Sequence, residues 1–342
     1  MPAAATQDPG VQTIAIPLNT RFLIIGRAGM DFYADPPGTR VQDARRFTSA
    51  LGGSSANIAA AICRQGGQAA LVTCVSDDAV GEYVLGQLAH FGIDAAHVRR
   101  VGDEARNSLA VVDTNGENTQ NTIYRNNAAD FRMNADDIAA VDFTRFGAVV
   151  GAGTVLASEP SRGATLLAFE RAKAAQIPIV LDVDYRPYSW PDAPTAAAVY
   201  ARAAKAADII VGNDDEFGVL AESYDGGLDA ARALAGQGKI VVYKMGHRGA
   251  ITLHGSNEHR TGVFRVDALK PTGAGDAFMG TFLASLATGH ALHDAVLRGS
   301  AAAAIVVTRV GCAPAMPTPR ELDDFLNTHP GPTAPKEQGP CT

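Results

Sequence analysis

Short apolar runs alternate with longer alanine-rich segments along most of this 342-residue chain. Such runs are typical of strands buried on both faces, and the segments between them have helix-favouring compositions. The predicted strands are residues 22–25, 70–75, 148–151, 179–182, 209–211, 240–243 and 250–253. The predicted helices are residues 55–65, 79–90, 161–175, 195–206, 228–235, 281–288 and 292–308, the last two apolar nearly all round. Regular alternation of this kind predicts a three-layer α/β/α sandwich around a mostly parallel central sheet.

Two segments break the alternation and predict a small β-lid, from about residues 33–50 and 105–128. The second contains two strand-like runs around Asn115-Gly116, a dipeptide that favours a tight hairpin turn. A lid over the sheet suits a group-transfer reaction, because a closed lid excludes water from the reacting atoms.

The two ends of the chain differ in composition from the rest. Residues 1–20 have the character of a loose leader and lack the basic and apolar segments of a secretory signal. Residues 329–342 are rich in proline and glycine, which is typical of a disordered tail. We therefore expect a single domain over residues 21–328.

Composition narrows the classes of function. The net charge is −7 and no basic cluster stands out, which disfavours nucleic acid and anionic membranes as partners. No apolar stretch reaches the roughly 18 residues that a membrane span needs. The cysteines form no C-x-x-C pair, so a zinc site is not expected, and their sparse use fits a reduced, cytoplasmic location. They are Cys63, Cys74, Cys312 and Cys341.

The most informative motif is PTGAGDAF at residues 271–278, where a loop of small residues enters an apolar helix. Small residues let backbone N–H groups approach a ligand, and the helix N-terminus adds partial positive charge. Gly273, Ala274 and Gly275 are the predicted anion hole for a transferring phosphoryl group. Asp276 is the predicted base that accepts the proton of the attacking hydroxyl. A plain helix cap after a glycine turn fits the same residues.

Other nucleotide-binding signatures are absent from the sequence. The GK at residues 238–239 is followed by Ile240 rather than by the Ser or Thr of a P-loop. GRAG at residues 26–29 follows the first predicted strand and does not match the G-x-G-x-x-G of dinucleotide-binding folds. Both absences disfavour a P-loop enzyme and an α/β oxidoreductase.

Polar residues near the first predicted strand and helix offer contacts to a hydroxylated ligand. Gly52 and Gly53 permit close backbone approach, and the amide of Asn57 both donates and accepts hydrogen bonds. Asp31 follows the first strand, and ligands of open α/β sheets bind beyond the strand C-termini. The simpler interpretations are a serine-capped helix and a solvated loop carboxylate.

Asn213 and Glu216 lie three residues apart at the start of a predicted helix and share one face of it. Such a pair can hold a hydrated Mg²⁺ beside nucleotide phosphates, since Mg²⁺ usually retains several waters. An ordinary helix cap with an acidic first turn is the alternative.

Three arginines lie in apolar or aromatic surroundings near predicted strand ends: Arg27, Arg125 and Arg186. The guanidinium fork matches the geometry of a carboxylate or a phosphate. Together they favour an anionic substrate, whereas each one alone is more typical of an ion-pair partner.

Over about residues 22–326 these motifs resemble the ribokinase-like (pfkB-type) carbohydrate kinases. The two signature segments are GGSSANIAAAICRQGG and KPTGAGDAFMGTFLASL, with VGNDDEF and KMGHRG between them. The resemblance implies the ribokinase-like fold and an enzyme that uses ATP and Mg²⁺. Four further segments resemble the 5-dehydro-2-deoxygluconokinases of inositol catabolism, with 2-keto-3-deoxygluconate kinases as the alternative. These are IIGRAGMDFY, TIYRNNAADFRM, LDVDYRPYSW and VVTRVGCAPAMPTPREL.

The resemblance also implies residue roles, with Asp276 as catalytic base and residues 273–275 as anion hole. The implied substrate contacts are Asp31, Gly52, Gly53, Asn57, Arg125, Arg186 and Arg27. Of these, Arg125 and Arg186 would face a substrate carboxylate, and Arg27 is typical of the subgroup without an assigned role. The implied nucleotide contacts are Asn213, Glu216, Lys244, Gly246, Gly249 and Ala303, the first two reaching Mg²⁺ through water.

One departure from the family pattern concerns a monovalent cation. Many relatives hold K⁺ with a stretch that begins with Asp or Asn and a small residue, where this chain has Lys270 and Pro271. A lysine there would replace or exclude the ion, so K⁺ dependence stays open. A homodimer through the lid edge and a non-catalytic sugar or nucleotide sensor also stay open, although the retained Asp276 argues against the sensor.

Overall fold

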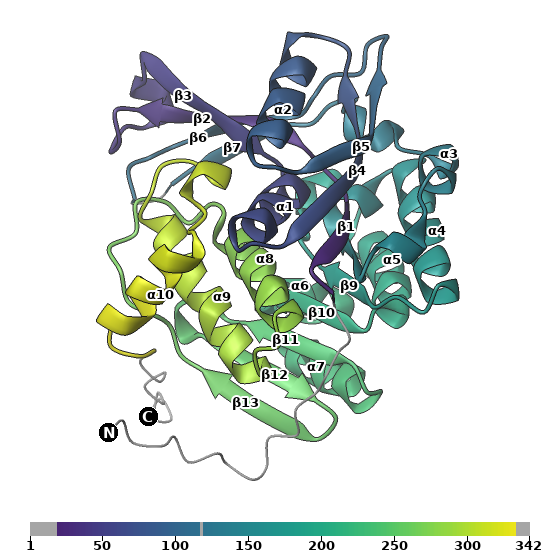
Figure 1. Ribbon diagram of the computed structural model, residues 1–342, viewed down its shortest axis with the longest axis vertical. Helices are drawn as coiled ribbons and strands as arrows, with labels where there is room; N and C mark the ends of the chain where they lie inside the picture. Colours follow the sequence, from purple (N-terminus) through teal and green to yellow (C-terminus); the bar gives the residue numbers. More distant parts are fainter. Residues whose placement is uncertain (1–18, 117–118, 333–342) are drawn as a thin grey trace.

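The computed structural model describes residues 19–116 and 119–332. At its centre is a nine-stranded sheet in the order β13-β12-β11-β10-β9-β8-β1-β4-β5 (Figure 1). Neighbouring strands from β11 to β5 pair in parallel, and β12 pairs antiparallel with β11 and β13. The predicted mostly parallel sheet is therefore confirmed. Its strands are β1 (Arg21–Ile25), β4 (Gln68–Ser76), β5 (Asp94–Val101), β8 (Ala148–Ala152), β9 (Ile179–Asp182), β10 (Ile209–Asn213), β11 (Ile240–Lys244), β12 (Ala250–His254) and β13 (Asn257–Thr261).

Alternate residues of the strands face two separate cores, because side chains project to opposite faces of a sheet in turn. In β1, Phe22 and Ile24 pack into one core, and Leu23 and Ile25 pack into the other. All four are fully buried, and burial of each such side chain stabilises the fold by about 1.5–3 kcal/mol. The helices that complete the two cores form the outer layers of the predicted sandwich (Figure 1).

One face of the sheet is covered by α1 (Ser54–Arg64), α2 (Ala79–His90), α8 (Ala274–Ala287) and α9 (Leu292–Val307). The other face is covered by α3 (Ala135–Ala139), α4 (Ser161–Ala174), α5 (Ala193–Ala206), α6 (Asp214–Leu220) and α7 (Gly227–Gly236). A last helix, α10 (Pro319–Thr328), packs against α9. Single 3₁₀ turns lie at Val41–Asp43, Ala129–Arg132, Phe143–Arg145, Gly153–Ala157, Pro187–Ser189, Tyr224–Gly226, Gly246–Arg248 and Ala313–Ala315. None of the helices in the described part of the chain is long and apolar enough to cross a membrane.

A second, four-stranded sheet forms the lid, in the order β3-β2-β6-β7. Its strands are β2 (Gly29–Asp35), β3 (Arg46–Gly52), β6 (Leu109–Val112) and β7 (Asn121–Tyr124). The predicted lid is present, but it begins at Gly29 rather than near residue 33 because β2 follows β1 after only three residues. Figure 1 shows this sheet projecting beside α2, away from the central sheet.

The prediction of a hairpin at Asn115-Gly116 is correct in the pairing of its strands but wrong in the length of its turn. β6 and β7 do pair antiparallel, but residues 113–120 connect them instead of a two-residue turn. The carboxylate of Asp113 accepts hydrogen bonds from the backbone N–H groups of Val41 (2.7 Å) and Gln120 (3.0 Å), which closes a wider loop. Residues 117–118 of this loop lie outside the described part of the chain.

Residues on either side of the predicted domain, 21–328, also make contacts with it. The carbonyl of Thr20 accepts a hydrogen bond of 2.6 Å from the N–H of Gln68, so the chain joins the sheet before residue 21. His329 stacks on Phe325 of α10 with ring centroids 3.7 Å apart. Most of the predicted leader and tail, residues 1–18 and 333–342 with Cys341, lies outside the described residues.

Candidate active site

The carboxyl ends of the central parallel strands bring together most of the predicted polar residues. Arg27 follows β1, Asp182 ends β9, Asn213 ends β10 and Lys244 ends β11. Ligands of open α/β sheets bind at this edge. The N-terminal ends of α1 and α8 face the same region, because Asn57 of α1 contacts Asp276 of α8. The sequence motifs therefore converge on one site.

Asp276 lies in the first turn of α8 and is half-buried. Burial, and after it the nearby Asp184 carboxylate, raise the pKa of Asp276 to about 6. The Asn57 side chain opposes this rise by donating a hydrogen bond of 2.9 Å from Nδ2 to Oδ2 of Asp276. A carboxylate whose pKa is close to neutrality is well matched to accept a proton from a hydroxyl at physiological pH.

The loop before Asp276 is shaped to accept an anion. Gly273 caps α8 in the left-handed conformation, with φ of 87°, and a Cβ on it would lie 2.7 Å from Sγ of Cys312. Nζ of Lys244 lies 3.6 Å from where a Cβ on Gly275 would be, so an ammonium group stands beside the loop. The helix N-terminus and this ammonium both favour negative charge.

Two acceptor oxygens in the substrate half of the site have no hydrogen-bond donor within the protein. Asp31 in β2 is buried against the backbone of Gly52, where a Cβ would lie 1.9 Å from Oδ1 of Asp31. Tyr33 donates a hydrogen bond of 3.2 Å to the other oxygen, Oδ2. Oδ1 of Asp31 and Oδ1 of Asn57 are buried and have no hydrogen-bond partner. Because such unpaired groups cost about 1–3 kcal/mol each, the site is suited to a ligand that supplies hydroxyl donors.

Two further carboxylates, Asp182 and Asp184, were not predicted from the sequence. Both are buried, and Oδ2 of Asp184 has no hydrogen-bond partner. Burial raises the pKa of Asp182 well above its usual range. Burial also acts to raise the pKa of Asp184, but the guanidinium of Arg186, 2.6 Å away, holds it below its usual value. The signal was present in the sequence as two aspartates flanking Val183 at a predicted strand end, two residues before an arginine.

The pfkB family carbohydrate kinase profile matches residues 19–319. The chain belongs to the pfkB family of carbohydrate kinases. The 5-dehydro-2-deoxygluconokinase of Photobacterium profundum is 37% identical over 312 residues, covering 90% of this chain and 94% of the relative. The 5-dehydro-2-deoxygluconokinase 1 of Bacillus cereus is 33% identical over 313 residues, with the same coverage.

Solved structures of related kinases share the fold of this pfkB kinase. A Vibrio cholerae O395 fructokinase double mutant with bound fructose, ADP and potassium ion has a TM-score of 0.78 at 25% identity, covering 91% of this chain and 99% of the other. A putative ribokinase II from E. coli in complex with ATP and Mg²⁺ has a TM-score of 0.80 at 22% identity, covering 91% and 100%. The ribokinase-like fold is thereby confirmed, and the oxidoreductase alternative is set aside.

In this pfkB kinase, Asn213 and Glu216 form the helix cap that the sequence left as an alternative. Oδ1 of Asn213 accepts the N–H of Glu216 at 2.8 Å, and Oε2 of Glu216 accepts the N–H of Asn213 at 2.7 Å. Burial raises the pKa of Glu216, against the attraction of Lys244. Among the described residues, no group of three or more His, Cys, Asp or Glu side chains is arranged to hold a metal ion. Because both side chains are engaged in the cap, they would reach Mg²⁺ through its water shell rather than directly.

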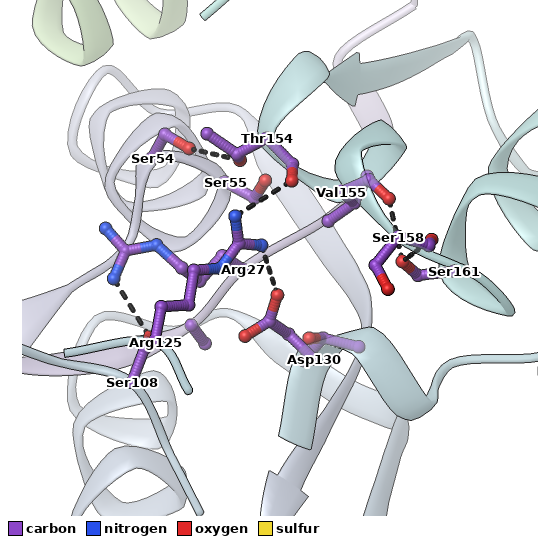
Figure 2. Close-up of polar contacts among 12 residues, drawn as sticks. Arg27, Ser54, Ser55, Ser108, Arg125, Asp130, Thr154, Val155, Ser158 and Ser161 are labelled. Carbon is purple, nitrogen blue, oxygen red and sulfur yellow. Dashed lines mark hydrogen bonds and ion pairs between the residues drawn. The ribbon is translucent and has the colours of Figure 1, made fainter. Parts of the chain in front are cut away.

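Arg186 lies at the site, whereas the guanidinium of Arg125 is held by contacts within the protein. The side chain of Arg186 is 46% exposed beside Asp184. Arg125 is buried, forms an ion pair with Asp130 and donates a hydrogen bond of 2.8 Å to the carbonyl of Thr154 (Figure 2). Its guanidinium also stacks over the ring of Phe131, 4.0 Å from the centroid. An arginine engaged on three sides is poorly placed for the predicted contact with a substrate carboxylate.

The remaining predicted residues lie on loops and helices that follow or pack against the elements named above. Gly53 has φ of 94° and immediately precedes α1. Gly246 and Gly249 lie in the turn between β11 and β12, and Ala303 is half-buried on α9, which packs against α8. Lys270 is fully buried, and its Nζ donates a hydrogen bond of 2.6 Å to the carbonyl of Thr272. An ammonium group thus stands directly before the anion loop.

Proposed function

We propose that this pfkB kinase transfers the γ-phosphoryl group of ATP to a hydroxyl of 5-dehydro-2-deoxygluconate. The observation that carries the chemistry is the Asp276 carboxylate, with a pKa of about 6, at the start of α8. The two relatives named 5-dehydro-2-deoxygluconokinase, which share 37% and 33% of their aligned residues with this chain, support the choice of substrate.

The proposed reaction is an in-line displacement at the γ-phosphorus. Asp276 accepts the proton of the substrate hydroxyl as its oxygen forms the new P–O bond and the bond to ADP breaks. The backbone N–H groups of residues 273–275 and the ammonium of Lys244 stabilise the charge on the transferring group. Asn213 and Glu216 would hold Mg²⁺ through water, and the bound ion would neutralise charge on the ATP phosphates. Positioning and electrostatics account for most of the catalysis in such transfers.

The substrate half of the site suits a hydroxylated acid. The unpaired oxygens of Asp31, Asn57 and Asp184 would accept hydrogen bonds from its hydroxyl groups. Arg186 would face its carboxylate, with Arg125 supporting the wall behind it. Gly52 and Gly53 keep the backbone close to the ligand. On the nucleotide side, the turn with Gly246 and Gly249 would hold ribose and phosphate, and Ala303 would line the adenine pocket.

We also propose a single kinase domain over residues 21–328, a cytoplasmic location and a homodimer through the lid. The dimer is supported by the lid's two edge strands, β3 and β7, which carry the exposed side chains of Phe47 and Tyr124. Exposed sheet edges with apolar side chains are prone to pair with another chain. Analytical ultracentrifugation of the wild type and a Phe47→Glu/Tyr124→Glu variant tests this, and a monomeric wild type would refute it.

The proposed activity is tested by coupled ADP release from Mg-ATP with four acceptors: 5-dehydro-2-deoxygluconate, 2-keto-3-deoxygluconate, fructose and ribose. We expect a strong preference in kcat/KM for the first. Preference for the second would assign the alternative substrate, and preference for a neutral sugar would discard the sugar-acid part of the proposal. A protein that binds a sugar acid but turns over none of the four would be a sensor.

A further inference from the structure

Arg27 is a buried arginine that the reaction scheme above leaves without a role. It lies between β1 and β2 and is only 8% exposed. Its backbone is fixed against the start of α1, because its carbonyl oxygen accepts a hydrogen bond of 3.2 Å from the N–H of Ala56. The same oxygen would lie only 2.5 Å from a Cβ on Gly53, so the two backbones are in close contact. Its side chain therefore projects from a rigid point within the site.

The guanidinium of Arg27 has no anionic partner among the described residues. Its side-chain hydrogen bond is to a neutral group and runs 2.9 Å from an Nη atom to Oγ of Ser108 (Figure 2). No carboxylate of the described residues lies within ion-pair distance of it. Buried charges are normally paired, and an arginine carries five N–H donors. Most of the binding capacity of this cation is thus left for a ligand.

The contrast with Arg125 is plain in Figure 2. Arg125 points between Asp130 and Thr154, and both are marked as its partners, whereas the guanidinium of Arg27 points toward Ser108. Two buried arginines in one region thus differ: Arg125 forms a direct ion pair within the protein, and Arg27 does not.

Arg27 also acts on the residues that define the substrate half of the site. Burial raises the pKa values of Asp31 and Asp276, and the positive charge of Arg27 opposes that rise; it also helps to lower the pKa of Asp184, so it lies within electrostatic reach of all three. These groups surround the space in which a sugar would offer its hydroxyls. A cation among them is placed to meet the charged end of the same molecule.

The lid holds this cation in position. Ser108 immediately precedes β6, and its carbonyl accepts a hydrogen bond of 3.2 Å from Met30 in β2. A Cβ on Gly29 would lie 3.3 Å from the Arg27 Nη1 atom, so the guanidinium lies against the beginning of β2. A guanidinium that is already ordered loses less entropy when it binds a carboxylate.

We infer that Arg27 binds the carboxylate of the sugar-acid substrate together with Arg186, that Ser108 orients the guanidinium of Arg27, and that Arg125 only supports the surrounding wall. This inference rests on the proposed function and deepens it, because it names a second residue, besides Arg186, that distinguishes an acid from a neutral sugar. A purely structural role for Arg27, balancing the three aspartates, makes a different prediction: its loss would affect all substrates alike.

The test compares 5-dehydro-2-deoxygluconate with its carboxamide, a neutral molecule of nearly the same shape. For wild type we expect the acid to be preferred in kcat/KM. Arg27→Gln should lower kcat/KM for the acid by about 100-fold, because a bidentate charge-assisted contact is lost, and for the amide by less than about tenfold. Arg27→Lys should give an intermediate acid-to-amide ratio, since it retains charge without the fork. Ser108→Ala should lower the ratio by a smaller factor.

The matched control is Arg125→Gln, which removes the neighbouring buried guanidinium. It should lower the unfolding midpoint while retaining the acid-to-amide ratio. An unchanged ratio in Arg27→Gln, or in Arg27→Lys and Ser108→Ala if the first variant does not fold, overturns the inference, as does a shifted ratio in Arg125→Gln. If wild type itself does not prefer the acid, the sugar-acid proposal fails, and the role of Arg27 fails with it.

Discussion

Nδ2 of Asn57 donates a hydrogen bond of 2.9 Å to Oδ2 of Asp276, across 219 residues of sequence. The bond joins the first turn of α1 to the first turn of α8 and so links the two signature segments of the family. It also leaves the second oxygen of Asp276 free of Asn57. One amide therefore orients the base and, through its own unpaired Oδ1, stays available to a substrate hydroxyl.

Replacement of Asp276 by Asn should abolish most of the activity. The amide cannot accept the proton of the attacking hydroxyl, and general-base help of the usual size predicts a fall in kcat of at least ~10². Single-turnover phosphoryl transfer with saturating Mg-ATP measures this directly, with circular dichroism as the control for folding. A loss of less than tenfold in a folded protein would remove Asp276 from the role of base.

The same residue should set the acidic limb of the pH profile. Because Asp276 must be deprotonated to act and its pKa is raised to about 6, kcat/KM should fall tenfold per pH unit below that value. Asn57→Leu removes a hydrogen bond that lowers this pKa, so its acidic limb should move to higher pH. An acidic limb near pH 4 in wild type, or one that Asn57→Leu moves downward, would contradict the assignment.

Asp276 should also reduce the stability of the fold. Its pKa of about 6 in the folded state lies above the ordinary aspartate value of 3.8, so between these pH values the folded state binds more protons and stability decreases as pH rises. Asp276→Asn should therefore be more stable than wild type above pH 6, by on the order of 1–2 kcal/mol after allowing for partial solvent screening. Urea unfolding at pH 7.5 and pH 3.5 tests this, because the difference should vanish at the lower pH.

The buried pair of Arg125 and Asp130 should be a stability determinant. Removal of one partner leaves an uncompensated buried charge, which typically costs about 3–5 kcal/mol. We expect Arg125→Gln and Asp130→Asn each to be strongly destabilised, and the double variant to be less so than the sum of the two. A double-mutant cycle by urea unfolding measures the coupling, and additive effects would show that the pair does not act as a unit.

The central sheet was predictable because most of its strands can be recognised from their apolar composition alone. β1, β9 and β10 are continuous apolar runs, and such runs have few alternatives to a buried parallel strand. β5 was missed because it lies at the edge of the sheet, where charged residues alternate with half-buried ones. The start of α8 was placed seven residues late by hydrophobicity alone, since its first turn consists of loop-like small residues.

The sequence predicted the role of a site residue only where the residue type and its sequence neighbours indicate a chemical function. Asp276 stands in a glycine-rich loop before an apolar helix, and the structure gives it the environment of a base. The state of an arginine depends on what folds against it. Nothing in the residues around Arg125 reveals that Asp130 neutralises it, and nothing around Arg27 reveals that its guanidinium bonds to the neutral Ser108. Charge compensation is a property of tertiary contacts, so sequence spacing could not rank the three arginines.

Lys270 should make this kinase independent of K⁺. Its ammonium is fully buried and donates a hydrogen bond of 2.6 Å to the carbonyl of Thr272, one residue before the anion loop. Burial lowers the pKa of Lys270, but the Cys312 thiol and the carboxylates of Asp276 and Asp31 act in the opposite direction and favour the charged form. The amine of Lys270 therefore already occupies the space beside the loop and donates to a carbonyl that a monovalent cation would otherwise use.

We accordingly expect wild-type rates that differ by less than about twofold between buffers containing KCl and tetramethylammonium chloride at equal ionic strength. Lys270→Met, which retains the aliphatic stem but removes the charge, should lower kcat because the carbonyl of Thr272 loses its donor and the loop loses its fixed geometry. Part of that loss should be restored by KCl and not by tetramethylammonium, which is too large for the vacated space. A wild-type rate that rises severalfold with KCl would show instead that the ion binds elsewhere and that Lys270 does not replace it.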